Sequence, residues 1–469
     1  MICTLFRNEL RGILRDGRGA MILALGALLS VVASWTATST DQRERQGHAE
    51  ATEQARAAWL EREPDNPHSR AHYGDFVFRP SGPLAGLDSG LQLVTGRSIR
   101  VEAHRQNAAV HVPHREASSL LRFDRLEPST VLHLVLPLIL VLVGFGLVAT
   151  ERETGRLRLL QIQGARPLPL LLAKSLALWT VGAVLCVLVI GTHVAFADGV
   201  EVGRTSAYLA VHLLVLWVVA VLVTSLSSRF RRPGPVAGVL LSLWVLGSIV
   251  LPRLGAMTAS AASPLPGRDA FNAAMQEDRE KGLDGHNPRD ERRQALEEQI
   301  LEEYGVADRK DLPINIGGLL MQADEEYGNQ VWDQHFGDLE AHLQEQSAIA
   351  RGFSLINPLH ATDRLSMAVA GTGLHGHLAF LRQAEAYRRT LVKSLNDEDA
   401  FGGARTGERG WTATPEFYAS FETFEYDPPD LGSLLGDHLM ELAALVAWAL
   451  GATGFLVFSA RRLEAGGSL

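Results

Sequence analysis

The sequence predicts a mainly α-helical, polytopic membrane protein with six transmembrane helices and a mixed, mostly helical extracytoplasmic domain. Three observations support this fold class. Six stretches of about twenty residues carry almost no charge, which is the length of apolar helix that a bilayer core requires. The arginines that flank these stretches collect in alternate connections. More than half of the chain lies in two long, charged segments between spans.

The overall composition excludes several other classes of protein. Of 469 residues, 46% are hydrophobic and 21% are charged, so the chain is neither disordered nor collagen-like. The formal net charge of −9 argues against a nucleic-acid binder, and we expect no nucleic-acid partner. Two cysteines, Cys3 and Cys186, cannot build a disulfide framework.

The apolar stretches give the spans in chain order. They cover residues 20–38, 131–149, 176–196, 207–226, 236–254 and 439–458. The first lacks a cleavage motif, so we interpret it as a retained span rather than a signal peptide. Residues 365–381 are also apolar, but they are short and contain three glycines and two histidines. We interpret them as a buried or membrane-surface helix, since a seventh span would place Arg461 and Arg462 outside.

Arginine clusters set the direction of the spans, because short cytoplasmic loops are enriched in Lys and Arg. With six alternating spans, every cluster falls on one side: Arg7, Arg11, Arg15 and Arg18; Arg152, Arg156, Arg158 and Arg166; Arg229, Arg231 and Arg232; Arg461 and Arg462. We therefore expect a multi-pass protein of the cytoplasmic (inner) membrane of a bacterium, with the lipid bilayer around it and both termini in the cytoplasm.

The predicted organisation follows from these spans. It comprises a cytoplasmic interfacial helix (1–19), span 1 (20–38), an extracytoplasmic segment (39–130), span 2 (131–149), a cytoplasmic loop (150–167), spans 3–5 (168–254), a large extracytoplasmic segment (255–436), span 6 (437–458) and a cytoplasmic tail (459–469).

The two extracytoplasmic segments have different local patterns. Residues 41–63 read as a charged helix that continues span 1, and residues 98–104 and 108–112 alternate as short strands do. Residues 290–304 and 318–352 have apolar residues at helical spacing. Each segment needs a partner for its apolar face, so we expect both to pack into one mainly helical domain with a small β part.

Motifs for catalysis and cofactor binding are weak. The chain has no G-x-x-x-x-G-K-[ST] loop, so we predict neither an ATPase nor any other enzyme, and no catalytic residue. Gly371-x-Gly373-x-x-Gly376 matches a dinucleotide fingerprint, but no strand precedes it, and we interpret it as helix packing.

Several histidines are closely spaced, but no cysteine ligand or H-E-x-x-H motif accompanies them. They are His68 and His72, His111 and His114, and His360, His375 and His377. We interpret them as solvated or core histidines and assign no metal. A site that transports or senses a soft metal is the alternative.

The N-terminal residues predict an amphipathic helix in the cytoplasmic interface. Its arginine stripe comprises Arg7, Arg11, Arg15 and Arg18, and its apolar side comprises Phe6, Leu10, Ile13 and Leu14. Ordinary topogenic charge is the alternative interpretation, and the two are compatible.

The connection after span 2 is the most informative segment. Residues 149–179 read ATERETGRLRLLQIQGARPLPLLLAKSLALW. The pattern predicts a short charged helix over 151–162, ended by Gly164 and Pro167 and held between two spans. A compact, exposed and partly apolar helix suits docking against a partner.

The pattern E-R-E-x-G-x-L-x-L-L, followed by G-x-x-P and a span that begins with a lysine, resembles the permease subunits of the ABC type-2 transporter family. In that family this loop is the coupling helix that fits into a cleft of the ATPase. Residues 356–372 and 380–388 resemble the subgroup with large extracytoplasmic insertions after the first and before the last span, described as a domain of unknown function.

The resemblance implies a transport subunit that carries no cofactor, with ATP and Mg on a separate cytosolic ABC ATPase. It implies a second permease copy or a sister permease, and export as the expected direction. The implied ATPase-coupling residues are Glu151, Arg152, Glu153, Gly155, Leu157 and Gly164. The alternative function is a membrane-anchored extracytoplasmic ligand sensor or assembly factor.

Overall fold

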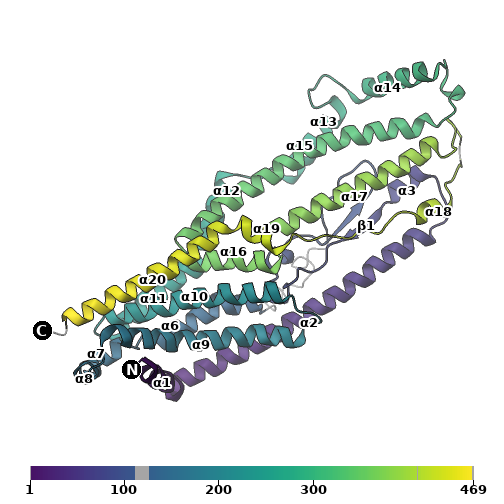
Figure 1. The fold of residues 1–469 in the computed structure, drawn as a ribbon. Coiled ribbons are helices and arrows are strands. Elements are labelled where there is room, and N and C mark those ends of the chain that lie inside the picture. Colours follow the sequence, from purple (N-terminus) through teal and green to yellow (C-terminus); the bar gives the residue numbers. More distant parts are fainter. Residues whose placement is uncertain (1, 111–125, 409, 467–469) are drawn as a thin grey trace.

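The computed structural model describes residues 2–110, 126–408 and 410–466. It is mainly α-helical, as predicted. Figure 1 shows an elongated molecule in which a bundle of apolar helices forms one end and a larger, charged domain forms the other. Both ends of the described chain lie at the far end of the bundle. We call the two parts the bundle and the polar domain.

Six helical segments within the described residues are long and apolar enough to cross a membrane, which agrees with the six-span prediction. The first is α2 (Gly17–Glu61), and the second runs through α5 (Pro128–Thr130), η3 (Val131–Val135), α6 (Leu136–Gly144) and α7 (Ala149–Glu153). Then come α9 (Pro167–Phe196), α10 (Val202–Arg229), α11 (Pro233–Val245) with η4 (Leu246–Val250) and α12 (Leu251–Ala262), and α20 (Leu439–Gly466).

Two spans contain a proline in their interior, and in both a wide π turn precedes it. The turn η3 comes before Pro137, and η4 comes before Pro252. Proline lacks the N–H that an α-helix needs, so the helix widens locally instead of breaking. Side chains satisfy backbone carbonyls in these turns: the Trp244 indole donates to Leu134 O, and the Asn357 amide donates to Gly247 O.

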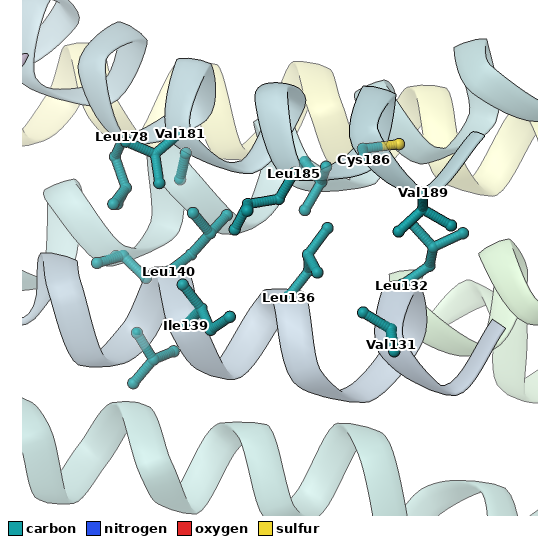
Figure 2. Close-up of a cluster of buried hydrophobic side chains, with 14 of the residues drawn as sticks. Val131, Leu132, Leu136, Ile139, Leu140, Leu178, Val181, Leu185, Cys186 and Val189 are labelled. Carbon is teal, nitrogen blue, oxygen red and sulfur yellow. The ribbon is translucent and has the colours of Figure 1, made fainter. Parts of the chain in front are cut away.

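The bundle core lies between α6, α9 and α10. Figure 2 shows Leu136, Ile139 and Leu140 facing Leu178 and Leu185. Gly144 allows the close approach, because a Cβ there would lie 2.6 Å from Leu178 Cδ2 and 2.5 Å from Val223 Cγ1. Packing therefore depends on a residue without a side chain at this crossing.

The polar domain is built from both long segments. The first supplies the outer half of α2, α3 (Pro67–Tyr73), β1 (Asp75–Phe78), η1 (Gly90–Leu93) and β2 (Ser98–Val101). The second supplies α13 (Arg268–Lys281), α14 (Arg289–Tyr304), η5 (Arg309–Asp311), α15 (Ile316–Gly352), η6 (Phe353–Leu355), α16 (Pro358–Ala370), α17 (Leu374–Phe401), α18 (Pro415–Ala419) and α19 (Leu431–Asp437). They share one core, which includes Trp59, Val77, Ile99, Phe380, Leu391 and Leu395.

The sheet is small. β1 and β2 pair antiparallel, with Phe76 opposite Arg100. The predicted strand over 98–104 ends at Val101, because His104 has a φ of 63° and turns the chain. Of the second predicted strand, Val110 forms an isolated bridge with Ser98, and residues 111 and 112 lie outside the described residues.

Residues 365–381 do not span the bundle, as expected, but they are not one helix. Gly371 has a φ of 73° and caps α16, and α17 starts at Leu374. The Gly371 backbone lies against Pro83, where a Cβ would approach Pro83 Cδ to 2.7 Å. The glycine motif thus permits close packing of the two long segments.

Candidate functional site

Four arginine clusters meet at one end of the bundle, which we call the arginine end. They lie on α1 (Ile2–Arg15) and the start of α2, on α7 and α8 (Arg156–Ile162), between α10 and α11, and on α20. Figure 1 shows α1, α7 and α8 there. Arg152 Nη1 donates to Ser228 O over 2.6 Å, and the Arg229 guanidinium lies 4.8 Å from the Phe458 ring centroid. The four arginine clusters thus lie at the same end of the bundle, as predicted. The assignment of that end to the cytoplasm stays a prediction.

A buried lysine ties three elements together at the arginine end. Lys174 on α9 is fully buried, and its Nζ lies 2.6 Å from Glu9 Oε1 on α1 and 3.0 Å from Glu151 Oε1 on α7. A buried ammonium requires charged partners, because an unpaired one would lose its hydration without compensation. This cluster, the Lys174 clamp, fixes α7 to α1 and to the third span, α9.

A second contact fixes the start of α7. The Ser227 hydroxyl on α10 accepts from the N–H groups of Val148 and Ala149, over 3.0 and 3.1 Å, and donates to Phe145 O over 2.8 Å. These backbone groups lie where the second span is interrupted, so they have no regular helical partners. The interruption is therefore held in a defined place.

The predicted single helix over 151–162 is wrong, because the structure divides it into α7 and α8. Gly155 between them has a φ of 74°, a left-handed conformation that glycine adopts without strain. The two short helices thus form a bent loop, the α7–α8 loop. Gly164 ends α8 with a φ of 92°.

The α7–α8 loop exposes two large apolar side chains. Leu159 is 61% exposed and Ile162 is 73% exposed, and Arg156 and Arg158 are exposed beside them. In contrast, Leu157 is 6% exposed and packs with buried Val148, Leu170 and Val218. Apolar surface rimmed by charge is typical of a protein contact.

The predicted coupling residues therefore fall into two groups. Glu153, Gly155 and Gly164 are exposed. Glu151 faces Lys174, Arg152 faces Ser228, and Leu157 faces the bundle. The prediction that Leu157 contacts a partner directly is corrected, because its side chain is buried in the bundle core. Sequence reasoning named Leu159 as an apolar residue of the docking helix, but it missed Glu9 and Ile162, although Glu9 is the only acidic residue before Asp16.

The predicted interfacial helix also changes. Arg7, Arg11, Arg15 and Arg18 are all exposed, but α1 ends at Arg15. The Asp16 carboxylate accepts from Gly19 N over 3.0 Å and caps a new helix, so Arg18 belongs to α2. Phe6, Leu10 and Ile13 pack on the bundle, whereas Leu14 is exposed.

The histidines that were grouped by their spacing in the sequence lie in different places in the structure. His68 and His72 lie together, and His104 joins them. His111 and His114 lie outside the described residues. His375 lies 3.1 Å from Asp437, His360 bonds Ala350 O, and His377 lies beside Arg79.

These features define a class: a helical, multi-pass membrane protein with a small clamped loop at one end and a large polar domain at the other. Residues 100–266 match the family described as ABC-2 family transporter protein, and residues 269–421 match a domain of unknown function, DUF3526. No curated protein matches the chain. These two matches agree with the resemblance of the loop motif and of the 356–388 region to an ABC-2 transporter permease that carries a DUF3526 domain.

Proposed function

We propose that this permease couples ATP hydrolysis on a separate cytosolic ABC ATPase to substrate movement, and that the α7–α8 loop is its contact with that ATPase. The observation that carries the proposal is the exposed pair Leu159 and Ile162 on a loop that is otherwise fixed to the bundle. The family match supplies the kind of partner, since the chain itself has no phosphate-binding loop.

The Lys174 clamp supports a mechanical role for the loop. A displacement of α8 moves α7, because the two helices are joined at Gly155. The ion pairs of Lys174 with Glu151 and Glu9 then transmit the displacement to α9 and α1. An ion pair inside a protein holds its geometry better than an exposed one. The clamp therefore lets a surface contact move two elements of the bundle together.

The proposal also gives an orientation and an assembly. The arginine end faces the cytoplasm, where ATP is present, and the polar domain lies on the opposite side. Two permease copies, or one copy and a sister permease, pair with two ATPases. Export is the proposed direction, and a ligand-sensing or assembly role is the alternative.

The test uses the full chain co-expressed with a candidate cytosolic ABC ATPase. Leu159→Asp combined with Ile162→Asp should reduce ATPase co-purification by about tenfold or more, because a truncated contact anchor typically costs at least 2 kcal/mol. Leu60→Asp is the matched control, since Leu60 is an exposed leucine on the polar-domain part of α2. Unchanged co-purification and ATPase activity in the double variant would overturn the proposal and favour the sensor role.

A further inference from the structure

Three histidines converge in the polar domain, from two elements of the first long segment. His68 and His72 lie on α3, and His104 lies in the turn after β2. One ring nitrogen of each lies within 4.8 Å of the others, and His68 Nε2 lies 3.0 Å from His72 Nε2. The centroid of the His104 ring is 5.3 Å from that of His68 and 5.0 Å from that of His72. We call these residues the His triad.

The local fold explains how the triad assembles. His68 and His72 are four residues apart, so they share one face of α3, and the Asn66 side chain caps that helix by accepting from His68 N over 2.9 Å. Ala103 N donates to Ala71 O over 2.9 Å, which fastens the His104 turn to α3. The convergence is therefore built by backbone and capping bonds rather than by the rings themselves.

His104 is held in an unfavourable backbone conformation. Its φ is 63°, and among the residues that the structure describes, no other non-glycine residue has a positive φ. Such a conformation costs about 1–2 kcal/mol for an L-residue. The Glu325 carboxylate accepts from the His104 N–H, and Arg279 Nη1 donates to His104 O over 2.7 Å. Strain that surrounding groups enforce is typical of a functional position.

Polar partners also orient two of the rings. His104 Nδ1 lies 2.6 Å from Glu325 Oε1, and Glu325 is itself buried and paired with Arg388 over 3.0 Å. His68 Nδ1 lies 3.3 Å from Asn396 Oδ1, and the Asn396 amide donates to Gln322 Oε1 over 3.1 Å. Both rings thus turn Nδ1 toward an oxygen, and Nε2 of His68 faces Nε2 of His72. Metal-ligating histidines show this arrangement, with a carboxylate or amide oxygen fixing the ring from behind.

We propose that the His triad binds a divalent first-row transition metal, Zn²⁺ or Cu²⁺, through its three imidazoles, with a further coordination position open to water or an external ligand. Three neutral imidazoles suit these ions, whereas Mg²⁺ and Ca²⁺ prefer oxygen. Neither cysteine of the chain is near, since Cys3 lies on α1 and Cys186 on α9, so a thiolate-rich site for Cu⁺ is not formed.

The His68–His72 pair requires little movement, and a ring nitrogen of His104 lies within 4.8 Å of theirs. With Zn–N bonds of about 2.0–2.1 Å, tetrahedral ligand nitrogens lie roughly 3.3 Å apart. The observed 3.0 Å between His68 and His72 needs to open by only a few tenths of an ångström. His72 is exposed, which gives an ion access from solvent. This inference goes beyond the proposed coupling to an ATPase and does not depend on it.

The test is metal binding by the full chain in detergent, purified without a polyhistidine tag and stripped with a chelator. Titration with ZnCl₂ or CuSO₄ against a competing chromophoric chelator should show one ion per chain, and MgCl₂ should not compete. His72→Ala should weaken binding by at least roughly tenfold, since even second-shell changes reach that size. His286→Ala is the control, because His286 is exposed in the α13–α14 connection.

A second variant protects the test against misfolding. Asn396→Ala leaves all three imidazoles in place and removes the partner of His68 Nδ1, so it should weaken binding less than His72→Ala. Equal affinity in the chain, in His72→Ala and in His286→Ala would overturn the proposal. The proposal would also be overturned if substitutions of Asp and Glu residues elsewhere weakened metal binding and substitutions in the His triad did not.

Discussion

The two ends of the molecule each contain a buried ion cluster, and the clusters differ in what lies next to them. The Lys174 clamp joins α1, α7 and α9, and α7 leads into α8, which carries the exposed Leu159 and Ile162. The Glu325–Arg388 pair joins α15 and α17 and lies beneath the His triad. The first cluster joins three helices next to an exposed apolar loop, and the second fixes the direction of a ring.

The number of bonds reflects this difference. Arg388 also contacts Glu385 over 2.8 Å and stacks 4.6 Å from the Trp332 ring centroid. Burial by itself raises the pKa of Glu325, but the hydrogen bond from His104 and the charge of Arg388 lower the pKa overall. Glu325 is therefore ionised at neutral pH. A densely bonded pair suits a rigid support, and a single lysine between two helix-borne carboxylates suits a joint.

The largest predicted effect is at the clamp. Lys174→Ala leaves two carboxylates facing each other without a cation, and removal of one partner from a buried ion pair costs about 3–5 kcal/mol. We expect a markedly lower thermal unfolding midpoint in detergent and loss of ATPase coupling. Lys281→Ala is the control, because Lys281 pairs with Glu277 on an open surface. Equal unfolding midpoints for the two variants would show that the ion pairs of Lys174 do not stabilise the packing of α1, α7 and α9.

A smaller effect is expected at the other cluster. Glu325→Gln keeps an acceptor for His104 and leaves Arg388 its bonds to Glu385, so we expect a loss of about 1–3 kcal/mol. It should also weaken Zn²⁺ binding by about 10–100-fold. A loss of stability as large as that of Lys174→Ala would remove the distinction between a joint and a support.

The smallest effect concerns the bend of the α7–α8 loop. Gly155→Ala places a side chain at a φ of 74°, which costs about 1–2 kcal/mol. Hydrogen exchange should become faster in α7 and α8 and stay unchanged in the polar domain. Gly191→Ala, near the C-terminal end of α9 with open space around its Cβ, should change neither region. Unchanged exchange in Gly155→Ala would mean that the bend is not needed.

Sequence patterns predicted the six spans because apolar length and flanking arginines are local properties. They did not predict the division at Gly155, since the same residues are compatible with one helix until the left-handed glycine is seen. The Lys174–Glu9 contact joins residues far apart in the chain, so no spacing reveals it. His68 and His72 were visible as an i, i+4 pair, but His104 joins them only through the β1–β2 pairing and the turn that Glu325 enforces.

The most direct test of the central claim is site-specific crosslinking at the α7–α8 loop. A chain with Cys3→Ser, Cys186→Ala and Ile162→Cys is assembled with the ATPase in inverted membrane vesicles and treated with a bifunctional thiol–photoreactive reagent. The same background with Leu60→Cys is the control. We predict that Ile162→Cys crosslinks to the ATPase in a yield that changes with ATP, and that Leu60→Cys does not crosslink to it. A crosslink from Leu60→Cys, or none from Ile162→Cys while the ATPase is bound to the vesicles, would contradict the assignment of the loop.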